Sequence, residues 1–325
     1  MDSSPESIAT TTLLVAHGDK QVTIEAVAGD HIAATIKASK NFYEWQFLGE
    51  LSQYLKAGDL VLDVGANIGN HSLYFAAVCG AQVISFEPLP LAAEILQRNV
   101  DRNSLQEHIE VRRKALGEGR SKAKLDKMDL SNVGATTFEL SPEGDFDVSA
   151  LDLEGILERV SLIKVDAEGM DLSVLKGATK LISRDRPIIA CEAATSVEQV
   201  ALERFASEIG YAFVAEFNAT PTYILAPAGT PLERARVERR AAGLLTRTHW
   251  ATRDLYYRVG LVNTNVKSLS DAQTPSAALD ELAKEGARAQ AALVDRVERL
   301  EAMVEALTGR LASGAEEQSP NEPQV

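Results

Sequence analysis

The segment at residues 60–73, LVLDVGANIGNHSL, constrains the fold more than any other part of this sequence. It opens with an apolar, partly β-branched run that is typical of a parallel strand covered on both faces, with Asp63 as its one polar residue. Gly65 and Gly69 then bracket a turn. Glycine permits positive φ and lets a backbone come close to a ligand, and a helix that begins near Gly69 presents unpaired N–H groups at its start. The segment therefore predicts a strand, a turn and a helix that together form a ligand site.

A second apolar strand is predicted at residues 83–86, and Glu87 follows it. An acidic residue in this place accepts hydrogen bonds from a ribose diol. The nicotinamide-dinucleotide fingerprint has glycine at its third position, where this chain has Asn67. The pattern favours an adenosine ligand without phosphate, S-adenosylmethionine, with its ribose at Glu87 and its amino-acid end at the turn near Asp63. The alternatives are a glycine turn that binds nothing and a nicotinamide-dependent oxidoreductase.

Strands and helices alternate regularly after residue 69, which predicts a doubly wound, Rossmann-like α/β sheet. The expected strands are 82–86, 109–113, 162–165, 187–191, 212–215 and 222–225, and the expected helices are 70–79, 91–103, 172–183 and 197–209. Residues 122–125 and 135–140 are expected as short strands or loop, with a flexible cover at 131–134. Ahead of the sheet, alternating segments at 13–15, 21–27 and 31–36 predict a β-hairpin extension, and residues 42–55 predict a helix.

Two blocks of sequence resemble the FkbM family of S-adenosylmethionine-dependent methyltransferases. The first is DVGANIGNHSLYFA, preceded by FYEWQFLGELSQYLKAGD and followed by VISFEP. The second is VSLIKVDAEGMDLSVLKGA, followed by RPIIACEA, and it departs from the family at Asp171, where glutamate is expected. The resemblance covers residues 41–192 and implies a seven-stranded methyltransferase sheet whose last two strands form a β-hairpin.

The cofactor site is expected along these motifs. Glu44 belongs to the motif near the cofactor in the resembling family, although an acid at a helix start that faces the helix dipole is an equally good interpretation. The loop at Ala115 follows the third strand, where an adenine ring usually packs, and a simple turn is the alternative. The full set of expected cofactor-binding residues is Glu44, Asp63, Gly65, Ala66, Asn67, Gly69, Asn70, His71, Glu87 and Ala115.

Candidate catalytic residues follow two later strands, because strand ends in a doubly wound sheet face the ligand crevice. Asp166 and Glu168 are the first candidates for a base that removes a hydroxyl proton, and Glu192 is the next. Lys164 is expected to pair with one of these carboxylates or to orient the substrate. An ion-paired network that only braces the strand ends is the alternative. A divalent cation held by Asp166 and Glu192 is a further alternative, but no metal site is predicted, because these two carboxylates offer too few ligands and no His-rich or Cys-rich cluster adds to them.

The composition narrows the partners. A formal net charge of −14 disfavours a nucleic-acid substrate, because phosphate binding needs clustered Lys and Arg. The two cysteines, Cys79 and Cys191, each lie in apolar sequence and are interpreted as buried thiols of a reducing compartment. Neither a leader peptide nor an apolar run of membrane-spanning length is present. We therefore expect a soluble, cytoplasmic protein.

The sequence changes character after residue 227. Residues 228–262 are rich in arginine and are expected as a basic helical extension, either a solvated face or an attractor for an anionic substrate. A polar linker at 263–276 precedes a seven-residue apolar repeat at 277–312, which predicts a coiled coil and a homo-oligomer. Residues 313–325 are expected to be disordered. The predicted domains are thus residues 1–40, 41–227, 228–262, 263–276, 277–312 and 313–325.

Taken together, the sequence predicts an S-adenosylmethionine-dependent O-methyltransferase that acts on a hydroxyl of a sugar, glycan or polyketide-like acceptor. The acceptor class is implied by the family resemblance alone. A noncatalytic assembly protein, whose coiled coil is the working part and whose sheet is a cofactor-binding head, is a further alternative.

Overall fold

The computed structural model describes residues 8–127 and 136–228. The chain divides into two units, Met1–Pro227 and Ala228–Val325. The predicted cover at 131–134, the linker, the coiled coil, the tail and all but the first residue of the basic extension lie outside the described residues.

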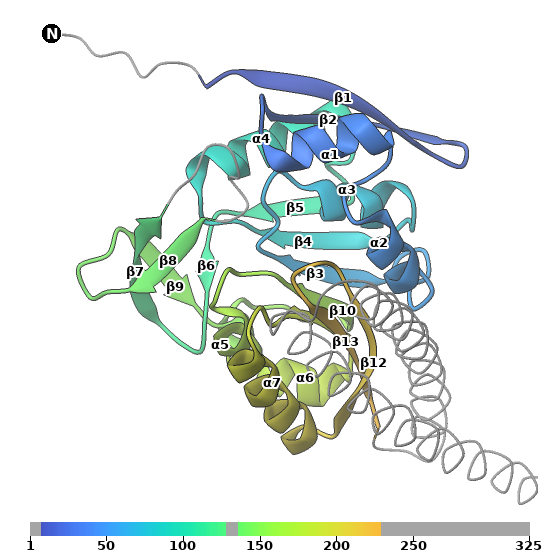
Figure 1. The fold of residues 1–325 in the computed structure, drawn as a ribbon. Coiled ribbons are helices and arrows are strands. Elements are labelled where there is room, and N and C mark those ends of the chain that lie inside the picture. The colour runs from blue at the N-terminus through green and yellow to red at the C-terminus, as the bar shows by residue number, and fades with distance from the viewer. Residues whose placement is uncertain (1–7, 128–135, 229–325) are drawn as a thin grey trace, which may run out of the picture. The chain divides into compact units, whose positions relative to one another are not determined.

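A seven-stranded sheet forms the centre of the first unit, in the order β12-β13-β11-β10-β3-β4-β5 (Figure 1). Neighbouring strands from β11 to β5 are parallel, whereas β13 pairs antiparallel with both β11 and β12. The strands are β3 (Leu60–Val64), β4 (Gln82–Phe86), β5 (Ile109–Arg112), β10 (Val160–Val165), β11 (Ile188–Glu192), β12 (Tyr211–Phe217) and β13 (Thr222–Pro227). Every residue of β3 is buried, Asp63 included, as its largely apolar sequence predicts. The doubly wound α/β fold is confirmed.

Helices cover both faces of this sheet (Figure 1). They are α3 (Asn70–Ala77), α4 (Pro90–Arg102), α5 (Asp171–Lys176), α6 (Thr179–Asp185) and α7 (Ser196–Glu208). The strand order reverses between β3 and β10, and parallel crossovers are right-handed, so α3 and α4 cover one face and α5, α6 and α7 cover the other. The reversal opens a crevice beyond the carboxyl ends of β3 and β10, where ligands bind in such folds.

The prediction of one helix at 172–183 is wrong, because the chain breaks between α5 and α6 at Gly177. A side chain at Gly177 would overlap the carbonyl oxygen of Gly117. The carbonyl of Gly177 also accepts a hydrogen bond from the backbone N–H of Asp152, at 2.9 Å. This break depends on a neighbour sixty residues away in the sequence, so helical periodicity does not reveal it.

The N-terminal region contains β1 (Thr10–His17), β2 (Lys20–Val27), α1 (His31–Ser39) and α2 (Trp45–Ser52). β1 and β2 pair antiparallel as a two-stranded sheet that lies beside α3 and α4 (Figure 1). The prediction of a strand at 31–36 is wrong. The side chain of Asp30 accepts hydrogen bonds from the backbone N–H groups of Ile32 and Ala33 and so starts a helix. Ile32, Ala33 and Ile36 then form its buried face.

A smaller sheet lies beyond the carboxyl ends of the central strands (Figure 1). It has the order β6-β9-β7-β8 and is built from β6 (Ala115–Leu116), β7 (Ser121–Lys127), β8 (Thr137–Leu140) and β9 (Phe146–Ser149). A 3-10 helix, η2 (Leu151–Leu153), follows it. The short strands expected at 122–125 and 135–140 correspond to β7 and β8. The sheet places apolar residues over one end of the crevice.

Both cysteines are free thiols; Cys191 is buried and Cys79 is half-buried. Burial raises the pKa of the Cys79 thiol to about 11. Within the described part of the chain, no helix combines the length and the apolar character needed to cross a bilayer.

Candidate active site

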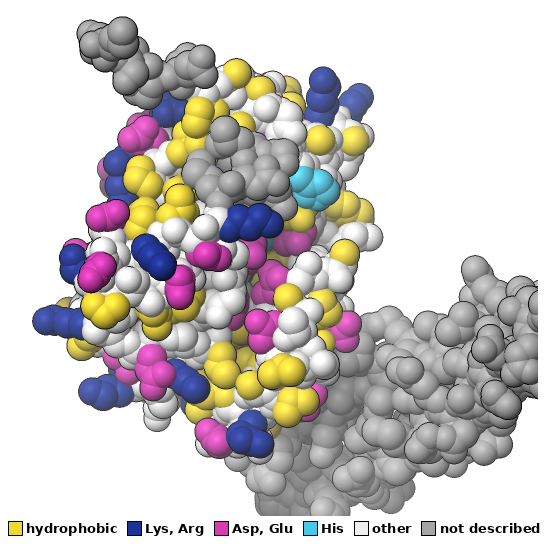
Figure 2. Space-filling view, turned by 60° about the vertical axis from the view of Figure 1, so that its left-hand side comes forward, with side chains coloured by type: hydrophobic (Ala, Val, Ile, Leu, Met, Phe, Trp, Pro, Cys, Tyr) yellow, Lys and Arg dark blue, Asp and Glu magenta, His cyan; other side chains and the backbone are white. Residues whose placement is uncertain are grey.

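A cavity of about 520 Å³ opens at the carboxyl ends of the central strands. Residues that follow β3, β4, β10 and β11 line it, together with residues of α1, the small sheet and the turn between β12 and β13. Acidic side chains gather around the hollow that Figure 2 shows in the middle of this face. Of the predicted site residues, Glu44, Gly65, Ala66, Asn67, Asn70, His71, Glu87, Ala115, Lys164, Asp166, Glu168 and Glu192 line the cavity.

The turn after β3 forms one wall of the cavity. Gly65, Asn67 and Gly69 all have positive φ, at 72°, 49° and 89°. A side chain at Gly65 would overlap the carbonyl oxygen of Asp166, and one at Gly69 would overlap the side chain of Leu96. The two glycines therefore serve the turn and the packing of neighbouring protein segments. The positive φ expected of these glycines is confirmed, and Gly65 also lines the cavity.

Glu87 lies at the end of β4 and is 7% exposed. One carboxyl oxygen accepts a hydrogen bond from the backbone N–H of Asn67, and the other accepts from the N–H of Leu89, both at 2.8 Å. Burial raises the pKa of Glu87 to about 7, although these two hydrogen bonds oppose the shift. Each oxygen keeps a further lone pair, so the carboxylate can accept two hydroxyl groups from the cavity side.

The strand register places Lys164 of β10 beside Asp63 of β3. Both side chains are buried, and Lys164 Nζ lies 3.2 Å from Asp63 Oδ1 and 3.0 Å from the carbonyl oxygen of Gly65. Ser72 donates a 2.6 Å hydrogen bond to the other oxygen of Asp63. Asp63 and Gly69 do not line the cavity, so Asp63 stands behind its wall and holds Lys164 in place.

Lys164 Nζ also lies 3.6 Å from Asp166 Oδ2, and both residues line the cavity. Burial alone would lower the pKa of Lys164, but the charges of Asp63 and Asp166 outweigh it and raise the pKa above the ordinary value. The ammonium group therefore stays charged across the physiological range. It supplies a fixed positive charge between one buried and one accessible carboxylate.

Three carboxyl groups face one another at the ends of β10 and β11. Burial and then the charge of Asp166 raise the pKa of Glu168 to about 7. Burial, followed by the charge of Asp166 and a hydrogen bond with it, raises the pKa of Glu192 well above its ordinary value. At neutral pH Glu192 thus holds the proton of the Asp166–Glu192 pair. The side chain of Asp166, the partner of Glu192 in this hydrogen bond, is 33% exposed.

Asp171, the residue at which the sequence departs from the resembling family, organises the loop that carries Glu168. Its two carboxyl oxygens accept hydrogen bonds from the backbone N–H groups of Ala167 and Gly169, at 3.1 and 3.2 Å. Glu168 and Gly169 both have positive φ, so this tight loop needs such support. Asp171 lines a separate space of about 80 Å³ behind the loop, which indicates a structural role for the shorter carboxylate.

Glu44 faces the cavity from the opposite side. It is the N-cap residue of α2, but its side chain makes no capping hydrogen bond. Instead, Glu44 Oε2 lies 3.2 Å from His71 Nε2, a distance that suits an ion pair but without hydrogen-bond alignment. The structure therefore favours the interpretation that Glu44 belongs to the site. The side-chain amide of Asn70 holds the preceding residue, Tyr43, through two 3.0 Å bonds to its backbone N–H and carbonyl.

Sequence reasoning missed several lining residues. Tyr43 faces the acidic side of the cavity, where burial and then the charge of Glu44 raise its pKa to about 12, so the phenol keeps its proton. Its place inside the FYEW motif was a usable signal. Strands β8 and β9 and the turn between β12 and β13 carry no such signal; the lining residues there are Phe138, Val148, Asn218, Ala219 and Thr220.

The cavity fits S-adenosylmethionine in both size and chemistry. Its volume lies within the range of cofactor pockets. A buried carboxylate, Glu87, stands near an apolar wall that includes Ala115 and Leu116, as ribose and adenine require. The amide oxygen of Asn67 is buried and has no hydrogen-bond partner, which marks a place for a donor from a ligand. By contrast, no cluster of metal-ligating side chains occurs among residues 8–127 and 136–228.

Comparison with known proteins agrees with this arrangement. Residues 63–218 match the model of the methyltransferase FkbM domain. Hexuronic acid methyltransferase AglP of Haloferax volcanii is 30% identical over 131 residues, which cover 38% of this chain and 52% of AglP. Methyltransferase sdnD of Sordaria araneosa is 27% identical over 167 residues, which cover 38% of this chain and 61% of sdnD. The chain thus spans less than two thirds of either relative.

Among solved structures, the crystal structure of methyltransferase FkbM from Methylobacillus flagellatus aligns with a TM-score of 0.41 and 23% sequence identity. The alignment covers 52% of this chain and 43% of that one. The family match covers the turn after β3, Glu87 and the carboxylates after β10 and β11. Residues 63–218 therefore match an FkbM-type methyltransferase domain, and methyltransferases of this type use S-adenosylmethionine as methyl donor.

Proposed function

We propose that this protein transfers a methyl group from S-adenosylmethionine to a hydroxyl group of a sugar, glycan or polyketide-like acceptor. One observation carries the proposal. A single cavity joins the Glu87 carboxylate, which suits a ribose, to the Asp166–Glu192 carboxyl pair, which suits a hydroxyl proton. A cofactor site and a proton acceptor thus face the same space.

The chain offers distinct groups for the ribose and the adenine of the cofactor. Glu87 accepts hydrogen bonds from the two ribose hydroxyls, and the unpaired amide oxygen of Asn67 accepts a further one. Ala115 and Leu116 pack against the adenine ring. When bound, the cofactor supplies an electrophilic methyl carbon on a sulfonium. The enzyme then has to align the acceptor oxygen behind that carbon and accept one proton.

Asp166 is the proposed general base. Lys164 lies 3.6 Å from its Oδ2 atom, and Glu192 shares a hydrogen bond with it and holds the proton of the pair. As the new carbon–oxygen bond forms and the carbon–sulfur bond breaks, the hydroxyl proton passes to the Asp166 carboxylate. Glu168 borders the same space and contacts the acceptor. In this proposal the same residues brace the strand ends and supply the catalytic group.

The charges in the cavity favour an uncharged acceptor. Two lysines line it, Lys114 and Lys164, and each is ion-paired with a glutamate or aspartate of the protein. Carboxyl groups of Glu44, Asp166 and Glu168 surround the remaining space. An acceptor that carries a carboxylate would meet repulsion there, because the described residues that line the cavity include no unpaired Lys or Arg to offset it. A neutral sugar hydroxyl is therefore preferred to a uronic acid.

Transfer of labelled methyl from methyl-tritiated S-adenosylmethionine tests the proposal. Neutral sugars, glycans and polyketide alcohols are offered beside matching uronic acids, with and without a chelator. We expect label in a neutral acceptor, no effect of chelation, and a loss of turnover of 100-fold or so in Asp166→Asn, as is typical for a removed general base. Asp147→Asn, an acid whose side chain is 90% exposed outside the cavity, serves as the control. Normal turnover in Asp166→Asn would exclude Asp166 as the base.

The assembly and location of the protein are further proposals. We propose that the apolar repeat at 277–312 joins copies of the chain as a coiled coil and that the protein works in the cytoplasm. Deletion of residues 276–325 tests the first point by light scattering. An active monomer after deletion would show that this segment only organises subunits. An unchanged number of subunits would contradict the coiled coil.

A further inference from the structure

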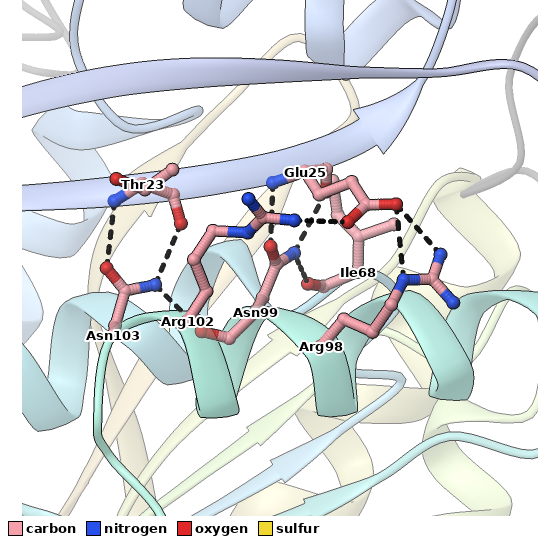
Figure 3. A network of polar contacts seen from close by, with 7 residues as sticks. All are labelled: Thr23, Glu25, Ile68, Arg98, Asn99, Arg102 and Asn103. Atoms are coloured by element: carbon pink, nitrogen blue, oxygen red, sulfur yellow. Dashed lines mark hydrogen bonds and ion pairs between the residues drawn. The ribbon is translucent and has the colours of Figure 1, made fainter.

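Strand β2 is held against helix α4 by a network of polar contacts (Figure 3). The network also reaches the turn at residues 65–69, which borders the cavity and is called the cofactor turn below. At its centre is Asn99, whose side chain is fully buried. The Asn99 amide oxygen accepts a 2.6 Å hydrogen bond from the backbone N–H of Glu25, and its amide nitrogen donates to the Glu25 carbonyl at 2.9 Å. The same nitrogen donates its second hydrogen to the carbonyl of Ile68, also at 2.9 Å.

Ile68 belongs to the turn that forms the cofactor wall. It lies between Asn67, whose N–H binds Glu87, and Gly69, which starts α3. Helix α4 presses on this turn at two points, because Leu96 fills the space beside Gly69 and Asn99 holds the carbonyl of Ile68. The turn has positive φ at three of its residues and depends on such outside support.

Charges secure the other end of the network. Glu25 is buried, and its two carboxyl oxygens each lie 2.9 Å from an arginine of α4, one from Arg98 and one from Arg102. The hydrogen bond from Arg98 holds the pKa of Glu25 below its ordinary value, although burial opposes it. The backbone of β2 at Glu25 is thus fixed to α4 by side chains on both sides of Asn99 (Figure 3).

We propose that β2 and α4 form a brace for the cofactor turn and that Asn99 is the positioning residue that transmits it. By holding the carbonyl of Ile68, Asn99 fixes the position of the neighbouring Asn67 N–H. That N–H binds Glu87, so Asn99 also fixes the orientation of the Glu87 carboxylate toward the ribose. Asn99 itself does not line the cavity, so its effect on the cofactor is indirect. This inference rests on the proposed cofactor site.

The chain contains a matched control one helical turn further along. Asn103 grips Thr23 of β2 in the same way, with its oxygen accepting from the Thr23 N–H and its nitrogen donating to the Thr23 carbonyl, both at 2.8 Å. The second hydrogen of that nitrogen returns to the carbonyl of Asn99, within α4. Asn103 therefore anchors β2 without a bond to the cofactor turn.

The test measures the affinity of S-adenosylmethionine by calorimetry for the full chain carrying Asn99→Asp or Asn103→Asp, together with thermal unfolding of each. An aspartate at either position turns the donor toward a carbonyl into an acceptor, so both variants lose stability. We expect the dissociation constant to rise about ten-fold or more in Asn99→Asp and to stay within about two-fold in Asn103→Asp.

Equal affinities in the two variants would overturn the role of Asn99, and failure of the wild type to bind would instead contradict the proposed cofactor site. Should Asn99→Asp not fold, Asn99→Ala and Asn103→Ala replace the pair. Amide hydrogen exchange adds a measurement that does not need the cofactor. We expect faster exchange at Asn67 in the Asn99 variant alone, and the same rate in both variants would likewise refute the brace.

Discussion

Glu87 allows the sharpest prediction about the cofactor site. Replacing it with glutamine keeps the size of the side chain but gives it an amide donor that faces either the Asn67 N–H or the Leu89 N–H, which now bind the carboxyl oxygens at 2.8 Å. The variant also loses the negative charge that two ribose hydroxyls would meet. Two charge-assisted hydrogen bonds contribute together about 2–3 kcal/mol, so the dissociation constant should rise by about 30- to 150-fold.

The pH dependence separates this effect from a general loss of structure. The pKa of Glu87 is raised by burial to about 7 in the free protein, and hydroxyl donors favour the ionised form. Cofactor binding then releases a proton below pH 7, so affinity should rise about ten-fold between pH 6 and pH 8. The folding stability of the unliganded protein changes with pH in the opposite direction to the affinity. A raised carboxyl pKa contributes stability below pH 4.5 that is lost as the pH rises through 7.

Calorimetric titration with S-adenosylmethionine at pH 6, 7 and 8 measures both quantities. Glu168 has a pKa near the same value, so the slope is compared between wild type and Glu87→Gln, and the difference belongs to Glu87. Glu94→Gln is the control, because Glu94 lies on α4 with its side chain 54% exposed. Equal affinity and equal pH slope in wild type and Glu87→Gln would refute the ribose assignment.

Two further predictions concern what holds the site together. Lys164→Met should lower the free energy of unfolding, measured by urea titration, by about 3–5 kcal/mol, because it leaves the buried Asp63 without a counter-charge. Adding Asp63→Asn to the same chain should recover part of the loss. A loss below about 1 kcal/mol would contradict the buried pair. Gly65→Ala should destabilise by about 2 kcal/mol or more, because its φ is 72° and the added carbon meets the backbone of Asp166. Gly49→Ala in α2 meets nothing and should be neutral or stabilising by about 0.5–1 kcal/mol, so equal effects at the two glycines would show that Gly65 has no special place.

Local sequence patterns predicted the parts of the fold that depend on local physics. The largely apolar strands β3 and β10, each with a single charged residue, are typical of strands covered on both faces, so their place in the middle of a parallel sheet followed directly. The acidic residues that follow β4 and β10 and the one that ends β11 were found for the same reason, because strand ends in this fold open on the crevice. Glu87 and Asp166 reach the cavity as expected.

Features that depend on distant neighbours were not predictable. A side chain at position 65 would overlap the backbone of Asp166, a contact that only the folded chain creates. The break between α5 and α6 likewise occurs where the backbone of Gly117 approaches Gly177. Asp63 lies on the same strand as cavity residues, but the strand register places it beside Lys164. It therefore pairs with Lys164 and does not line the cavity. No sequence pattern encodes such cross-sheet pairings.

Asparagine in the middle of a helix gave no signal at all. Helix propensity marks Asn99 as a mildly unfavourable residue, and its three hydrogen bonds to β2 and to the cofactor turn appear only in the folded chain. The helix at His31–Ser39 was missed because alternating apolar residues suggested a strand, while the capping side chain of Asp30 decided the outcome.

A crystal structure of the protein with S-adenosylhomocysteine tests the central claim most directly. We predict that the ribose hydroxyls lie within hydrogen-bond distance of Glu87, that adenine packs against Ala115 and Leu116, and that the sulfur faces Asp166 across the cavity. A nucleoside bound elsewhere, or a turn at residues 65–69 that closes over Glu87 in the presence of saturating ligand, would contradict the account.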